Sequence, residues 1–189
     1  ISSHLKDSNF FINEIILELR KNVKLRWEAF GKTTRKGFHS GGKIDLFKNP
    51  PKNICKLQSI ILDELELYYS KFKDQSCSYI KKWPLEKKIK GWHVILKKQG
   101  YQVPHMHASG WLSGIIYLKV VPPLKKNEGA IEFSLNGDYF FDINSPKKMF
   151  EPKIGDIVFF PSSLHHRTIP FSTDSDRMVI AFDLAPNKS

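Results

Sequence analysis

The sequence predicts a mainly β domain of the jelly-roll type, with N-terminal helices that form a supporting layer. After Trp83-Pro84, short apolar segments alternate with turn residues, and no helical periodicity separates them. Before that point, apolar residues recur at the spacing of amphipathic helices. The 189 residues are enough to bury one core without disulfides, so we expect a single domain over 1–189.

The helical part is expected over residues 1–84. Apolar residues recur at i, i+3 and i+4 up to about Arg20, and again from Ile54 to Phe72, which predicts two amphipathic helices. Between them lies Thr33–Phe47, whose three glycines interrupt any regular pattern. We therefore predict a loop over this segment.

The β part is expected over residues 85–189. Apolar and β-branched residues gather in segments of strand length, bounded by Gly, Pro, Asn and Ser. The predicted strands are Gly91–Lys97, Leu112–Val121, Ala130–Leu135, Asp156–Phe160 and Met178–Leu184. Strands that follow one another without crossover helices favour an antiparallel sandwich or barrel, of which the jelly roll is one form.

Composition limits the possible partners and compartments. The formal charge of +11 permits an acidic partner or substrate, but the lysines occur as scattered pairs without interleaved aromatic residues, so we do not expect nucleic acid binding. Cys55 and Cys77 have no metal-type spacing, which favours a reducing cytoplasm. No apolar stretch reaches membrane-spanning length. The missing initiator Met is consistent with the C-terminal piece of a longer protein.

Two histidine pairs and one arginine are the candidate metal-binding and ligand-binding residues of the sequence. His105 and His107 are two residues apart, so on an extended chain both imidazoles share one face and can reach one metal ion. A second pair, His165 and His166, follows an apolar strand. Arg177 opens the last strand, at the mouth of an apolar interior, where a guanidinium can bind a carboxylate bidentately.

Taken in order, these residues resemble a subgroup of the 2-oxoglutarate/Fe(II)-dependent oxygenases, whose fold is the double-stranded β-helix. The elements that carry the resemblance are Trp92; His105 and His107; Ser113, Gly114, Tyr117 and Leu118; Gly129 and Phe133; Phe160, Pro161, Ser162, His166, Thr168 and Pro170; and Arg177. The resemblance covers about Trp92 to Pro186 and extends less securely back through the Thr33–Phe47 loop.

The resemblance implies a dioxygenase with Fe(II), 2-oxoglutarate and O2, most simply a hydroxylase of an unidentified small molecule or peptide side chain. His105, His107 and His166 would hold the metal, and Arg177 would bind the distal carboxylate of 2-oxoglutarate. Tyr117 and Ser113 would hydrogen-bond the cosubstrate, although Tyr117 is equally well explained as a core aromatic residue.

His107 departs from the family pattern, because most members have Asp or Glu at this position. Two alternatives stay open: either three histidines bind the metal, or two histidines and a water do. His166 is favoured over His165 by its spacing to Thr168, and we interpret His93 as structural, His39 as an ordinary loop histidine and Trp92 as core.

Two other functions compete with the oxygenase. One is a three-histidine cupin-type metalloenzyme that does not use 2-oxoglutarate, against which Arg177 and the late position of His166 argue. The other is a non-catalytic metal-binding or interaction domain that docks an acidic partner through its basic surface.

Overall fold

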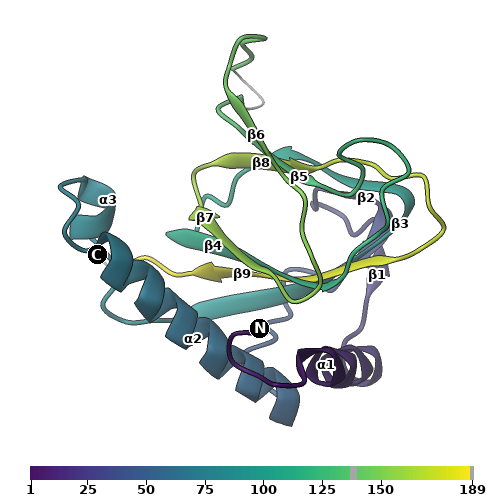
Figure 1. The fold of residues 1–189 in the computed structure, drawn as a ribbon, viewed down its shortest axis with the longest axis horizontal. Coiled ribbons are helices and arrows are strands. Elements are labelled where there is room, and N and C mark those ends of the chain that lie inside the picture. Colours follow the sequence, from purple (N-terminus) through teal and green to yellow (C-terminus); the bar gives the residue numbers. More distant parts are fainter. Residues whose placement is uncertain (137–139, 188–189) are drawn as a thin grey trace.

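A computed structural model describes residues 1–136 and 140–187 as an antiparallel sheet that curls on itself, with helices packed on its outer face (Figure 1). The helices are α1 (Ser8–Asn22), α2 (Lys52–Phe72) and α3 (Ser78–Lys81). The strands are β1 (Arg26–Trp27), β2 (Thr34–His39), β3 (Ile89–His105), β4 (Leu112–Lys119), β5 (Ile131–Ser134), β6 (Lys147–Phe150), β7 (Ile157–Pro161), β8 (His165–Thr168) and β9 (Arg177–Leu184). The predicted jelly-roll type of fold with a helical layer is confirmed.

The strand order is β6-β5-β8-β3-β9-β4-β7, and β2 and β1 continue from the other edge of β3. The long strand β3 connects the two halves of the curl. Its first half pairs with β9, from Ile89 to Leu96, and its end pairs with β8, where His105 lies opposite His166. Between these halves Gln99 has a positive φ of 61°, and the register with β2 shifts. This bend turns the end of β3 away from β9 and toward β8.

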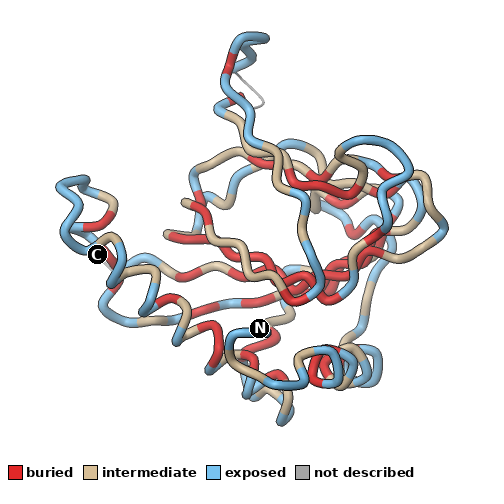
Figure 2. Tube along the Cα trace, in the orientation of Figure 1, coloured by how far each residue is buried: buried red, intermediate tan, exposed pale blue. Residues whose placement is uncertain are grey.

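Alternate residues of β9 serve two separate cores. Met178, Ile180 and Phe182 belong to the cluster that contacts the helices. Val179 and Ala181 belong to the cluster inside the curl. This division follows from the period of two along a strand, which sends successive side chains to opposite faces. Figure 2 shows buried residues both along the central strands and on the inward faces of the helices.

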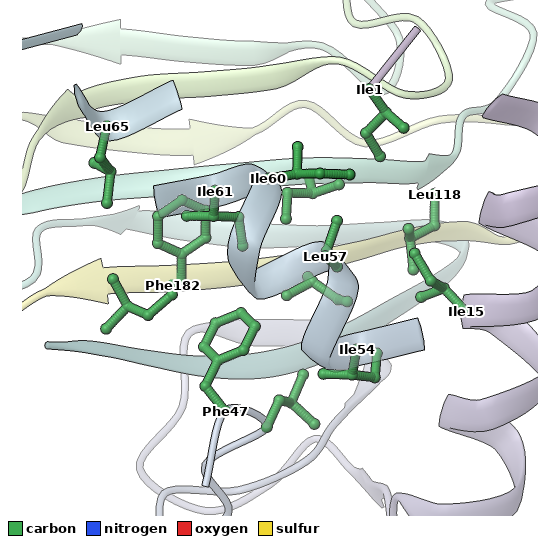
Figure 3. Packing of buried hydrophobic residues seen from close by; sticks show 14 of the residues in the cluster. Ile1, Ile15, Phe47, Ile54, Leu57, Ile60, Ile61, Leu65, Leu118 and Phe182 are labelled. Carbon is green, nitrogen blue, oxygen red and sulfur yellow. The ribbon is translucent and has the colours of Figure 1, made fainter. Parts of the chain in front are cut away.

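Helix α2 is held on the sheet by its apolar face. Leu57, Ile61 and Leu65 are fully buried, and each such side chain contributes about 1.5–3 kcal/mol on burial. Figure 3 shows them against Phe182 of β9 and Phe47. The N-cap residue of α2 makes no side-chain bond, but the Glu18 carboxylate of α1 accepts hydrogen bonds from the first N–H groups of the helix at 3.2 and 3.3 Å.

The sequence interpretation was wrong in one segment and incomplete in others. Thr33–Phe47 is not entirely a loop, since its residues 34–39 form β2 on the edge of β3. Gly37 is required there by close approach, because a Cβ would lie 2.5 Å from the Ile95 carbonyl oxygen. The short strands β1, β6 and β8 were not predicted, and the predicted strand Gly91–Lys97 extends through His105. Among the described residues, no helix is long and apolar enough to cross a membrane.

Candidate metal centre

Three histidines meet where the end of β3 pairs with β8. His105 ends β3, His166 lies opposite it on β8, and His107 follows in the turn after β3. One ring nitrogen from each lies within 4.8 Å of the other two. The turn is fixed by the backbone N–H of His107, which donates to the Ser162 carbonyl at 2.9 Å. The predicted strand geometry at His107 is therefore replaced by a turn, but the imidazoles still converge.

The hydrogen bonds at Nδ1 determine which nitrogen each ring can offer to a metal. The Nδ1 of His105 lies 2.7 Å from the Val103 carbonyl oxygen, and that of His166 lies 3.1 Å from the Leu164 carbonyl oxygen. A carbonyl only accepts, so each Nδ1 carries the proton. The Nε2 lone pair of each ring is then free, which is the form that binds a metal ion.

The protonation equilibria favour the same form. Burial lowers the pKa of His105 to about 4, with a smaller opposing contribution from the hydrogen bond to the Val103 carbonyl. Burial, followed by the positive potential of His105 and His107, lowers the pKa of His166 to about 3. Both imidazoles are therefore neutral near pH 7, so protons do not compete for the metal-binding lone pairs.

His107 is supported by a carboxylate that sequence reasoning missed. Its Nδ1 lies 2.7 Å from Oδ1 of Asp183 and 2.8 Å from the Ser113 hydroxyl. Ser113 also donates to Asp183 at 2.7 Å and contacts Ser162 at 2.8 Å. An ionised carboxylate only accepts, so it holds the proton on Nδ1 and leaves Nε2 free. Asp183 could have been found by alternation along the last strand, since it shares a face with Arg177.

Arg177 is a buried cation without a counterion. Arg177 is 1% exposed, and its Nε donates to the Gly129 carbonyl at 3.1 Å. Its guanidinium lies 5.0 Å from the centre of the Tyr117 ring. Its Nη2 and the Tyr117 hydroxyl have no hydrogen-bond partner, and no carboxylate of the described residues pairs with it. Burial lowers the pKa of Arg177, which is the cost that an anion would relieve. The arrangement fits a ligand carboxylate.

The remaining predicted residues have different surroundings. The Ser113 hydroxyl is engaged with His107 and Asp183, so it supports the histidines and lies apart from the pair of Arg177 and Tyr117. His165 is half-buried on the other face of β8 from His166, as alternation predicts. His93 is buried and bonded to the Val179 carbonyl oxygen at 2.8 Å, in agreement with a structural role.

The interpretation of His39 as a loop residue was wrong, and that of Trp92 as core was incomplete, since Trp92 packs against the inner core and also lines the cavity. His39 belongs to β2 and is 5% exposed, and its ring stacks on Trp92 at 6.4 Å between centres. Both line a cavity of about 330 Å³ that opens over His105 and His107. Trp92 also meets His107 edge to face at 5.3 Å, so it is part of the site rather than core alone. His39 was missed because its segment was taken for a loop.

Comparison with known proteins agrees with this geometry. Residues 90–183 match the family described as "Putative 2OG-Fe(II) oxygenase", and this span contains the three histidines, Asp183 and Arg177. No curated protein matches the chain.

Solved structures share the fold at low identity. A prolyl-4-hydroxylase from Pseudomonas putida is 15% identical with a TM-score of 0.63, over 95% of this chain and 88% of that chain. HygX from Streptomyces hygroscopicus, with nickel and 2-oxoglutarate bound, is 11% identical with a TM-score of 0.61, over 95% and 80%. A Trichoplax adhaerens prolyl hydroxylase, in complex with a hypoxia inducible factor peptide fragment, is 12% identical with a TM-score of 0.63, over 94% and 78%.

At these identities the structural likeness establishes the fold, and the family match carries the classification. Fe(II), 2-oxoglutarate and O2 are the metal and cosubstrates of that family, and the donor set of the site fits the first two. Through residues 90–183, the chain belongs to the 2OG-Fe(II) oxygenase family.

Proposed function

We propose that this protein hydroxylates its substrate at a carbon atom, with Fe(II) held by His105, His107 and His166. One observation carries the proposal: three imidazoles converge with their Nε2 lone pairs free, inside the same curled sheet that buries Arg177 without a counterion. A metal that binds the first set and a dicarboxylate that pairs with the guanidinium would satisfy both.

Fe(II), when bound, would supply the activation of O2 that couples oxidative decarboxylation of 2-oxoglutarate, to succinate and CO2, to insertion of one oxygen atom into a substrate C–H bond, with the other oxygen atom entering succinate. The electrons come from 2-oxoglutarate and from that C–H bond, so no further reductant is required. This chemistry belongs to the metal and the cosubstrate, and the protein provides binding and orientation.

The protein's own residues have separate tasks in this scheme. Arg177 binds the distal carboxylate of 2-oxoglutarate through its guanidinium, and the unpartnered Tyr117 hydroxyl donates to the same ligand. Asp183 keeps the proton on Nδ1 of His107 and thereby orients its Nε2. Val179, Ala181 and Phe160 form an apolar interior that excludes water around the cosubstrate.

We also infer that residues 1–187 act as one domain, because α1, α2 and the outer face of β4 and β9 contribute to one apolar cluster (Figure 3). A reducing compartment such as the cytoplasm is supported by two exposed cysteines, Cys55 and Cys77, which form no disulfide.

Formation of succinate tests the proposal. The protein is loaded anaerobically with Fe(II), mixed with 2-oxoglutarate and O2, and assayed for succinate with and without the metal. Slow turnover that requires Fe(II) and is lost in His166→Ala is the expected result. If the protein binds iron but not 2-oxoglutarate, a three-histidine cupin-type metalloenzyme would be favoured instead. Failure to bind iron would favour a non-catalytic domain.

A further inference from the structure

The cavity over the histidines is lined by positively charged side chains, which the proposed hydroxylase activity does not itself require. It has a volume of about 330 Å³ and lies between the loop before β2, the segment after β2, the start of β3 and the turn after β3. Its lining includes His105 and His107 but not Arg177. The cavity is therefore separate from the arginine and is open to a substrate, at the small end of the range for ligand pockets.

Two lysines of this lining converge on Gly42. The Lys90 ammonium donates to the Gly42 carbonyl at 3.3 Å. The Lys32 ammonium lies 3.4 Å from the position that a Cβ of Gly42 would take. Neither lysine forms an ion pair within residues 1–136 and 140–187. The two ammonium groups repel each other, and an anion bound between them would offset this repulsion.

His39, which lines the same cavity, also provides a hydrogen-bond donor. His39 accepts the backbone N–H of Gly41 at its Nδ1, at 2.9 Å. The ring is uncharged near pH 7, because burial and, to a smaller extent, the Lys32 charge lower its pKa to about 4. Its proton is therefore on Nε2, which makes that atom a donor.

The carboxylate that lines the cavity already accepts hydrogen bonds from neighbouring side chains. Asp183 is the one carboxylate among the lining residues, and its Oδ1 accepts from both His107 and Ser113. Among the lining residues, the one negative charge of Asp183 faces the two positive charges of Lys32 and Lys90, so a net positive charge remains.

We propose that this cavity is an anion subsite, in which a carboxylate or phosphate of a small organic substrate binds between Lys32 and Lys90 while its oxidised carbon lies over His105 and His107. The inference rests on the proposed function. It names the substrate class as a small organic acid or phosphate monoester, and it gives part of the net charge of +11 a specific use.

The test uses the Zn(II)-loaded protein saturated with 2-oxoglutarate, so that Arg177 is occupied and no turnover occurs. Inorganic phosphate and acetate are titrated separately, and binding is followed through the indole signals of an ¹⁵N-labelled sample. We expect saturable binding that the double variant Lys32→Gln/Lys90→Gln weakens about tenfold. The tighter of the two anions identifies the substrate group as phosphate or carboxylate.

The matched control is Lys36→Gln/Lys43→Gln, which removes the same charge from neighbouring positions outside the cavity lining. It should change the dissociation constants less than twofold. Equal weakening in both double variants, or no saturable binding by the wild type, would overturn the anion subsite. Succinate formation by the wild-type enzyme separates the two proposals: turnover without anion binding overturns the subsite alone, and anion binding without turnover overturns the proposed function.

Discussion

Oδ1 of Asp183 lies 2.7 Å from Nδ1 of His107, one of the three histidines whose ring nitrogens cluster. Most 2OG-Fe(II) oxygenases have a carboxylate ligand where this chain has His107. Here the carboxylate lies one hydrogen bond further out, on the last strand. The negative charge is thus retained near the three histidines, where it would make the imidazole a better donor to a bound metal.

Replacement of Asp183 should weaken metal binding without removing a ligand. Loss of a carboxylate that orients a metal-bound histidine typically costs about 10–100-fold in affinity, and we expect this for Asp183→Ala. Asp183→Asn should lose less, because its amide oxygen can still accept from Nδ1. Competition with a chelator measures the constants. Equal affinity for Asp183→Ala and the surface control Asp174→Ala would contradict the role.

Substitution of His107 decides between three histidine ligands and two histidines with water. If the imidazole is a ligand, His107→Ala should weaken Fe(II) binding substantially, and His107→Asp should retain it by restoring the commoner ligand type. We favour ligation, since Asp183 and Ser113 hold this ring with Nε2 free. Calorimetric titration with metal tests it, and near-normal affinity of His107→Ala would establish the water alternative.

Arg177→Ala should weaken 2-oxoglutarate binding and leave iron binding nearly unchanged. A charge-assisted, bidentate contact contributes on the order of 1.5–3 kcal/mol, so the KM for 2-oxoglutarate should rise about ten- to a hundredfold. Arg177→Lys should recover part of this, because an ammonium provides a charge without the fork of donors. Unchanged 2-oxoglutarate affinity in Arg177→Ala would show that the cosubstrate is anchored elsewhere.

Acid should destabilise the metal-free protein partly through His93. Burial lowers the pKa of His93 to about 4, from an ordinary value of 6.5. Between these two pH values the unfolded chain binds a proton that the native state excludes, so stability is complete above pH 6.5 and is lost as pH falls toward 4.

This histidine alone should account for about 2 kcal/mol between pH 6.5 and 4.5. His93→Asn retains a donor for the Val179 carbonyl without titrating, so its free energy of unfolding should fall less with acid. Urea denaturation at both pH values measures the difference. An identical acid-induced loss in wild type and variant would exclude the contribution of His93.

The clustering of the three histidines could be predicted because it depends on motif order and short-range geometry. The alternation that separates His166 from His165 needs no knowledge of the tertiary fold, whereas the close spacing of His105 and His107 brings their rings together through a turn and not through the predicted strand. The pairing of His105 with His166 depends on how β3 bends, and the family resemblance supplied it. The two main helices followed from their apolar periodicity for the same local reason.

The residues that were missed depend on contacts between distant segments. Alternation places Asp183 on the same face of the last strand as Arg177, but it does not indicate that β9 brings Asp183 beside His107, which is 76 residues earlier. His39 lies in a glycine-rich stretch that reads as a loop, and only the edge of β3 converts it into a strand. Short strands such as β8, with four residues, form because neighbouring strands provide their hydrogen bonds.

The most direct test of the account is an anaerobic titration of Fe(II) into the protein in the presence of 2-oxoglutarate, followed by visible absorption. Chelation of Fe(II) by the keto acid produces a charge-transfer band that neither component gives alone. The wild type should take up one Fe(II) per chain and show this band, and both His105→Ala and His166→Ala should lose it while they keep the wild-type circular dichroism spectrum. Wild-type protein that binds no iron, or a band that persists in His166→Ala, would contradict a centre built on these three histidines.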